Sequence, residues 1–279
     1  MPELREARVK TESRRGPSAL DLVRLSSKPV FPSGGEALYR QIARLTELAP
    51  GCEVLDAACG RGLSTLFLAE AYGIEGAGVD PNAALIREAE ARARDVQLEG
   101  RVHFQQAALD DLPYRDEVFD VAIGEIGLAV PADPAAAVRE LVRVTRPMGC
   151  VVLVQLIWTG NVAPERQKTL VEHLGARPLI LVEWKQLLRD AGVVEISVED
   201  WSDEPSPYRP EVRSPFPDLS RIFSVREKIA ILRRALRRWG WDGVRGAIAR
   251  EQEVSRLLSR ERALGLSLIK GTRWPEALP

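Results

Sequence analysis

Apolar runs and amphipathic helical patterns alternate through the first two thirds of the chain. The short apolar runs at 54–57, 76–80, 102–104, 118–123 and 150–154 have the length of buried strands. Between them, residues 63–69, 83–93 and 134–144 repeat apolar positions at helical spacing, and Asp133-Pro134 forms a typical helix start. This alternation predicts an α/β fold with a doubly wound, Rossmann-like parallel sheet and right-handed crossovers.

A glycine-containing loop follows the first predicted strand. Gly60 and Gly62 lie between the run Val54–Asp56 and a helix that starts near Leu63. Such a loop lets a nucleotide approach the backbone at a helix N-terminus. Thr65 stands where a dinucleotide motif has its third glycine, and Asp56 would repel a pyrophosphate but attract an ammonium or a sulfonium. The loop therefore favours a cationic amino-acid nucleotide over a dinucleotide.

A second acid ends the next predicted strand. Asp80 closes the run Gly76–Asp80, and Pro81-Asn82 begins the following helix. The carboxylate of Asp80 can accept hydrogen bonds from both hydroxyls of a ribose, or it can simply cap that helix. Because ligands of parallel sheets bind at the carboxyl ends of the strands, we favour the ribose role beside the glycine loop.

The first motif, Val54-Leu55-Asp56-Ala57-Ala58-Cys59-Gly60-Arg61-Gly62, resembles that of the class I S-adenosylmethionine (SAM)-dependent methyltransferases. Ala58 replaces the family's first glycine. The resemblance continues over roughly residues 35 to 200, through Leu112-Pro113-Tyr114 and the segment 146–154. Within that class, the chain is similar to the small-molecule group that includes ubiquinone and menaquinone C-methyltransferases. The resemblance implies a seven-stranded sheet with an antiparallel last strand.

The resemblance also implies a set of cofactor contacts. SAM, with S-adenosylhomocysteine as its product, would contact residues of the first two motifs and the ends of the next strands: Asp56, Ala58, Gly60, Gly62, Asp80, Pro81, Asn82, Ala108, Leu109 and Gly124. Ala108 stands where the family has an acid that binds the adenine amino group. Adenine recognition then rests on backbone groups or on Asp110 or Asp111.

The last strands of the expected core are separated by a long insert. Residues 193–198 and 264–270 have strand patterns, and between them lie the proline-rich stretch 204–210 and two predicted helices. We therefore divide the chain into a tail and cofactor-covering segment at 1–34, a SAM-binding core at 35–200, a helical lid at 201–262, and a final core strand and tail at 263–279. In the first helix of the lid, helical spacing predicts one buried face: Val225, Ile229, Leu232, Leu236 and Trp239.

The insert is basic, and all six tryptophans follow the fifth strand. A solvated face is the commonest role of such a charge run. An anionic substrate, a peripheral membrane contact or an RNA contact are the alternatives. We expect the tryptophan-bearing additions to form a hydrophobic, partly aromatic substrate pocket, with Trp158 after the fifth strand and Tyr39 on the helix before the first strand as candidate substrate contacts.

Composition and charge limit the ligands and surroundings that the chain can have. The chain has 279 residues, 45% of them hydrophobic, and a net charge of −1, which offers no overall field for nucleic acid. The three cysteines are odd in number and lie in or beside predicted strands, without metal-ligand spacing, so we expect buried thiols, a cytoplasmic location and no metal. No apolar stretch is long enough to span a membrane. A monomer and a homodimer both remain open.

Methyl transfer needs a positioned nucleophile and, for some acceptors, a base. Glu125 after the fourth strand is the first candidate base, and His173 in a first lid segment at 157–180 is the second. A mechanism by placement alone needs neither. The sequence therefore predicts a methyltransferase that acts on a small, hydrophobic or partly anionic molecule by in-line displacement. The alternatives are a non-catalytic SAM-binding protein and a methyltransferase that acts on RNA or protein.

Overall fold

The computed structural model describes residues 25–26, 34–131, 133–160, 162–174, 176–202, 223–259 and 263–275. The chain divides into two compact units. The larger contains Phe31–Val162, Gly175–Pro215 and Ala263–Pro279, and the smaller contains Met1–Val30, Ala163–Leu174 and Phe216–Arg262. The proline-rich stretch 204–210 lies outside the described residues.

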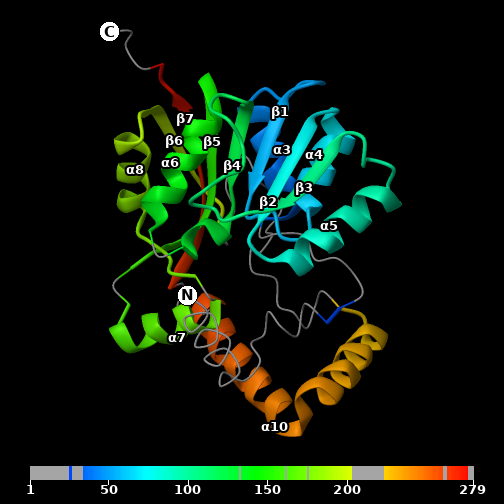
Figure 1. Cartoon of the computed structure of the whole chain (residues 1–279). Helices are drawn as coiled ribbons and strands as arrows, with labels where there is room; N and C mark the ends of the chain where they lie inside the picture. The colour runs from blue at the N-terminus through cyan, green and yellow to red at the C-terminus, as the bar shows by residue number, and fades with distance from the viewer. Residues whose placement is uncertain are drawn as a thin grey trace, which may run out of the picture. The chain divides into compact units, whose positions relative to one another are not determined.

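The larger unit is built on a seven-stranded sheet in the order β3-β2-β1-β4-β5-β7-β6 (Figure 1). The first five of these strands in that order are parallel, and β7 pairs antiparallel with both β5 and β6. This confirms the predicted fold class. The strands are β1 (Glu53–Ala57), β2 (Glu75–Asp80), β3 (Val102–Gln106), β4 (Phe119–Gly124), β5 (Thr145–Trp158), β6 (Val193–Asp200) and β7 (Leu264–Arg273).

Helices connect the parallel strands. The order of the strands reverses between β1 and β4, so right-handed crossovers place α4 and α5 on one face of the sheet and α6 on the other. The carboxyl ends of β1 and β4 meet at this switch point, where ligands bind in open parallel sheets. The helices of this unit are α3 (Gly35–Leu45), α4 (Leu63–Tyr72), α5 (Ala83–Asp95), α6 (Pro134–Val144) and α8 (Leu181–Asp190), with a 3₁₀ turn, η1 (Ile126–Ala129).

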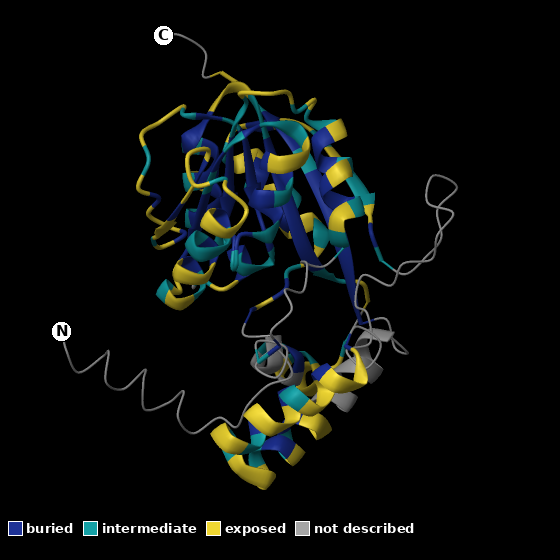
Figure 2. Cartoon of the chain, turned by 90° about the vertical axis from the view of Figure 1, so that its right-hand side faces the viewer, coloured by how far each residue is buried: buried dark blue, intermediate teal, exposed yellow. Residues whose placement is uncertain are grey.

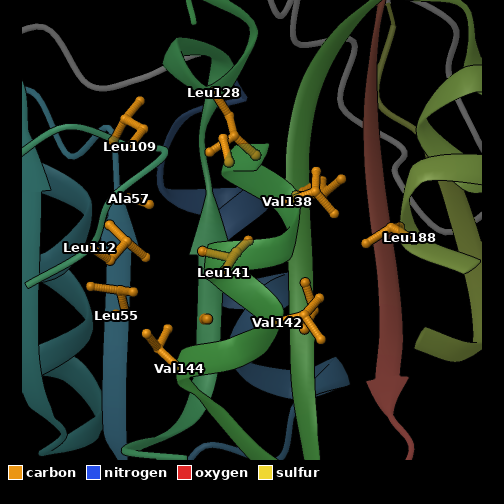
Figure 3. Close-up of a cluster of buried hydrophobic side chains, with 14 of the residues drawn as sticks. Leu55, Ala57, Leu109, Leu112, Leu128, Val138, Leu141, Val142, Val144 and Leu188 are labelled. Atoms are coloured by element: carbon orange, nitrogen blue, oxygen red, sulfur yellow. The ribbon is translucent and has the colours of Figure 1, made fainter. Parts of the chain in front are cut away.

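The hydrophobic core lies between the sheet and helices α6 and α8. Leu141 and Val138 of α6 are fully buried with Leu55 of β1 and Leu188 of α8 (Figure 3). In Figure 2 the strands of this unit are mostly buried, whereas its helices turn exposed residues outward. Burial of these aliphatic side chains stabilises the sheet at roughly 1.5 to 3 kcal/mol each and so holds the strand ends that carry the predicted site.

The smaller unit contains α7 (Pro164–Leu174) and α10 (Val225–Ser259). Gly240 interrupts α10 with a φ of 67°, which agrees with the two helices expected there. The predicted buried face of α10 is wrong in its first half: Val225, Ile229 and Leu232 are 71%, 47% and 38% exposed, whereas Leu236 and Trp239 are half-buried. The buried positions belong to the neighbouring stripe of the helix, Glu227, Ile231 and Ala235.

Residues 25 and 26 contact α10 at and beside its buried stripe. The Ser26 hydroxyl donates to Glu227 Oε1 at 3.0 Å, and Arg234 Nη1 donates to the carbonyl of Leu25 at 2.6 Å. Periodicity shows that a helix has an apolar stripe, but the neighbours that a helix meets decide which side is covered. None of the helices in the described part of the chain is both long and apolar enough to cross a membrane.

Candidate active site

The loop from Ala58 to Gly62 joins β1 to α4 with three residues in the left-handed region: Ala58, Gly60 and Gly62 have φ values of 69°, 55° and 71°. The two glycines differ in what surrounds them. A Cβ on Gly62 would lie 2.4 Å from the Phe104 ring, whereas a Cβ on Gly60 would meet no atom within 4 Å. Gly62 is therefore required by packing, and Gly60 borders an open space in which a ligand can approach the backbone.

Asp56 lies in β1, immediately before the loop, and is 1% exposed. Its Oδ2 accepts hydrogen bonds from the hydroxyls of Ser64 at 2.6 Å and Thr65 at 2.7 Å, both in the first turn of α4. Its Oδ1 is buried without a hydrogen-bond partner among the described residues. One half of the carboxylate is thus oriented by the protein, and the other half remains available to a donor.

Asp80 ends β2 and is 8% exposed. Its Oδ2 accepts from the backbone N–H of Gly60 at 3.1 Å, and its Oδ1 accepts from the backbone N–H of Asn82 at 2.8 Å. The Asn82 side chain caps α5 by accepting from Ala84 N at 2.9 Å. Asp80 therefore holds the glycine loop to the end of β2, and the capping predicted for this region belongs to Asn82.

Glu125 directly follows β4 and is 8% exposed. The fully buried Tyr39 of α3 donates its hydroxyl to Glu125 Oε1. Two residues predicted separately, one as a substrate contact and one as a base, are thus a hydrogen-bonded pair. Neither residue type nor spacing indicates this contact, because α3 and the β4 end are far apart in the sequence.

Burial and mutual repulsion raise the pKa values of the acids in this site. Burial raises the pKa of Asp56 to about 6, opposed by the hydrogen bonds from Ser64 and Thr65, and the charge of Asp80 raises it further. Burial, then the charge of Asp56, hold the pKa of Glu125 well above its usual range. Burial and the charge of Glu125 raise the pKa of Tyr39 as well. The site is therefore an environment that favours protons or another cation.

Ala58 fills the position at which the resembling family has a glycine. Its left-handed φ costs roughly 1 kcal/mol or more for a residue with a Cβ. The methyl group of Ala58 lies over Gly127 of η1, where an added Cβ would come within 2.6 Å of Ala58 Cβ. The glycine missing from the loop is thus matched by a glycine on the facing turn.

This pairing predicts a strong coupling between the two positions. Gly127→Ala should lower the free energy of unfolding by about 1 to 3 kcal/mol because of overpacking. In an Ala58→Gly background the same change should cost much less, since the clashing methyl group is absent. Denaturant unfolding of the four proteins measures the coupling, and Gly100→Ala, where an added Cβ meets nothing within 4 Å, is the control. An equal loss in both backgrounds would contradict the contact.

The remaining predicted contacts fall in different surroundings. Leu109 is 3% exposed and belongs to the core, whereas Ala108 is exposed, as are Asp110 and Asp111. A Cβ on Gly124 would lie 2.8 Å from Leu128, so close packing requires this glycine. Pro81 is exposed, and its carbonyl accepts from Gln106 Nε2 at 3.1 Å.

Two further predicted residues, Trp158 and His173, do not belong to the strand ends that carry Asp56, Asp80 and Glu125. Trp158 is the last residue of β5, half-buried, and its backbone N–H donates to the carbonyl of Leu179 at 3.2 Å. His173 lies in α7 of the smaller unit, and its side chain is outside the described residues.

Three residues of the site have no counterpart among the predicted ones. In the sequence analysis, Thr65 is only the residue that replaces a third glycine, and Ser64 is given no role. In the structure both hydroxyls orient Asp56. Gln155 of β5 is fully buried and donates to the backbone of the β4 end. Two adjacent hydroxyls at the start of a helix after an acidic strand end are a recognisable pattern. A single glutamine in an apolar strand is a weaker one.

The chemistry of the site fits a cofactor with a positive charge and a ribose. The unpartnered Oδ1 of Asp56 can accept from an ammonium, and the open space at Gly60 admits a nucleotide next to Asp80. No arginine or lysine among the described residues forms an ion pair with Asp56 or Glu125. No group of three or more His, Cys, Asp or Glu in the same part of the chain could hold a metal ion. The three cysteines are free thiols, and burial raises the pKa of Cys59.

Comparisons with known proteins point to the same cofactor. Residues 54–149 match the family model described as a methyltransferase domain. The O-methyltransferase resE of Aspergillus sclerotiorum is 27% identical over 184 residues, which cover 65% of this chain and 70% of that protein. The residues matched by the family model include the glycine loop, Asp56 and Asp80.

Solved structures share the fold. The cyclase SpnF superposes with a TM-score of 0.64 at 23% identity, covering 86% of this chain and 82% of that one. Phosphoethanolamine N-methyltransferase 2 of Haemonchus contortus, solved in complex with SAM, superposes with a TM-score of 0.70 at 14% identity, covering 92% of this chain and 58% of that one. The chain is therefore a class I methyltransferase that depends on S-adenosylmethionine and has the Rossmann-like fold of that class.

Proposed function

We propose that this methyltransferase transfers a methyl group to a small, hydrophobic or partly anionic molecule by in-line displacement in a lidded pocket. The observation that carries the proposal is the buried Tyr39–Glu125 pair, next to the acids of the cofactor loop. A buried carboxyl with a hydroxyl bonded to it can receive a proton from an acceptor group. The named function of resE as an O-methyltransferase supports an acceptor of this kind.

The residues of the loop would hold the cofactor, which supplies an activated methyl group when bound. Asp56 Oδ1 would accept from its ammonium, Asp80 would accept from its ribose hydroxyls, and the backbone at Gly60 would border it. Backbone groups near Ala108 and Leu109 would contact its adenine, in place of an acid. These residues orient the methyl group, and placement supplies much of the rate.

Glu125 acts on the acceptor. Burial and the charge of Asp56 hold the pKa of Glu125 well above its usual range, which increases the affinity of its carboxylate for a proton. The carboxylate takes the proton that the acceptor oxygen or nitrogen releases, while Tyr39 holds one of its oxygens. His173 is the second candidate base, and Trp158 is proposed to contact the acceptor.

The acceptor class rests on the insert. Its exposed arginines, Arg226, Arg233, Arg237 and Arg238 among them, favour a molecule with some negative charge. Carbon methylation of a quinone-type ring, as the core motifs imply, falls within this class. Methylation of RNA or protein is the competing outcome.

Labelled methyl groups identify the acceptor class directly. The purified chain is incubated with methyl-labelled SAM and, separately, with a low-molecular-weight extract of the organism that encodes it, with total RNA and with protein. We expect label in the small-molecule extract alone. Label in RNA or protein instead would overturn the proposed acceptor class.

Glu125→Gln tests the proposed base. It should lower turnover by at least about a hundredfold, since general-base catalysis contributes on that scale, and should change cofactor affinity far less. Stopped-time assays and calorimetry separate the two quantities. Glu199→Gln is a matched control, because Glu199 also accepts side-chain hydrogen bonds, from Gln41 and Trp201, on the distant strand β6. Unchanged turnover in Glu125→Gln would leave placement as the whole mechanism.

A further inference from the structure

A glutamine interrupts the apolar sequence of β5 near its carboxyl end. Gln155 is fully buried, with Val154 and Leu156 as its neighbours. Its Nε2 donates to two consecutive backbone carbonyls, those of Gly124 at 2.9 Å and Glu125 at 2.7 Å. Both hydrogens of the amide are therefore used at the end of β4.

The hydrogen bonds of Gln155 lie at the end of the ladder between β4 and β5. The last register pair between β4 and β5 is Gly124 with Leu153, so the regular ladder does not extend to Glu125. On its other side, the backbone N–H of Glu125 donates to the carbonyl of Ala57 in β1 at 3.0 Å. Glu125 is thus held from both neighbouring strands, by Ala57 next to Asp56 and by the side chain of Gln155.

The amide of Gln155 is satisfied on one side only. Gln155 Oε1 is buried without a hydrogen-bond partner among the described residues. An unpaired buried acceptor lowers stability, whereas the two hydrogen bonds from Nε2 satisfy the carbonyls at the end of β4. The amide at this position is therefore explained better by the two carbonyls to which it donates than by the stability of the strand.

We propose that Gln155 is a positioning residue, which fixes the backbone of Glu125 so that its carboxyl stays on the Tyr39 hydroxyl and beside Asp56. The proposal rests on the proposed role of Glu125. Without the amide, two buried carbonyls lose their donor, and the turn η1 shifts to reach another. The carboxyl of Glu125 then leaves the position from which it meets the acceptor.

A double-mutant cycle tests the proposal. Gln155→Met keeps the length of the side chain and removes both donors. We expect it to lower kcat by about 10- to 100-fold, the scale of a small misplacement, with the KM for SAM within about threefold. The Gln155→Met, Glu125→Gln double variant should lose no more than Glu125→Gln alone, because Gln155 acts through Glu125.

A second readout does not need turnover. Titration with S-adenosylhomocysteine in two buffers of different ionisation enthalpy counts the protons released on binding. Glu125→Gln should change that count, Gln155→Met should change it in the same direction, and the double variant should match Glu125→Gln. Thr145→Val, which removes another buried hydrogen bond of β5, from Oγ1 to Leu141 O at 2.7 Å, should lower Tm and keep the wild-type count.

The outcomes separate the two proposals. A lower Tm in Gln155→Met with wild-type kcat and proton count, or losses that add to those of Glu125→Gln, would overturn the role of Gln155. Wild-type behaviour of Glu125→Gln itself would instead overturn the proposed role of Glu125. If Gln155→Met does not fold, Gln155→Glu serves in its place, since it has nearly the same shape and loses at least one donor; wild-type kcat in that variant would also overturn the proposal.

Discussion

Asp56→Asn is expected to make the cofactor-free protein more stable at pH 7.5 and to remove nearly all of its affinity for SAM. Burial raises the pKa of the Asp56 carboxyl to about 6 in the folded protein, above its ordinary value of 3.8. The folded state therefore binds more protons than the unfolded state between about pH 4 and pH 6, and stability falls as the pH rises through that range. Above it, the ionised Asp56 opposes folding by at most about 3 kcal/mol.

Asparagine has no charge at this position and can still accept from Ser64 and Thr65. The gain in stability should appear at pH 7.5 and vanish near pH 4, where aspartate is protonated as well. Affinity should fall at least about 30-fold, because a buried charge loses its partner. Wild-type affinity should itself weaken as the pH falls below about 6, and that dependence should be reduced in Asp56→Asn.

Thermal unfolding across pH and calorimetry with S-adenosylhomocysteine measure these effects. Asp120→Asn is the matched control: Asp120 accepts from the backbone N–H of Glu53 at 2.9 Å, away from the loop. It should lower stability and leave cofactor affinity unchanged. A less stable Asp56→Asn protein with wild-type affinity would show that Asp56 is a structural acceptor only.

Asp80→Ala should weaken cofactor binding by roughly 1 to 3 kcal/mol, since it removes the acceptor proposed for the ribose hydroxyls. It also frees the backbone N–H groups of Gly60 and Asn82, so a loss of stability should accompany the loss of affinity. Calorimetry gives the first quantity and denaturant unfolding gives the second.

A cap variant separates these two effects. Asp133→Ala removes the side chain that caps α6 by accepting from Ala135 N at 2.9 Å. It should cost about 1 kcal/mol of stability with unchanged cofactor affinity. Asp80→Ala with the same pattern as Asp133→Ala would reduce Asp80 to a loop and cap residue.

The strand ends could be predicted because their signals are local. Asp56, Asp80 and Glu125 follow short apolar runs, and parallel strands bring their carboxyl ends to one edge of the sheet. The switch point between β1 and β4 follows from right-handed crossovers. Alternation and handedness therefore account for the placement of the site.

Contacts across the fold could not be predicted in the same way. Tyr39 meets Glu125 only because α3 is packed into the fold, and Ala58 is accommodated by Gly127 on another turn. Ser26 meets Glu227 in the buried stripe of α10, a contact that periodicity does not contain. In each case the deciding partner lies far along the chain and has no motif of its own.

The central claim is that Asp56 and Asp80 make the loop a site for a cationic nucleotide. Calorimetric titration with S-adenosylhomocysteine and with NADH tests it most directly. We predict saturable binding of one S-adenosylhomocysteine per chain, with weaker binding in Asp80→Ala and no measurable binding of NADH. Tight binding of NADH, with none of S-adenosylhomocysteine or SAM, would contradict the account.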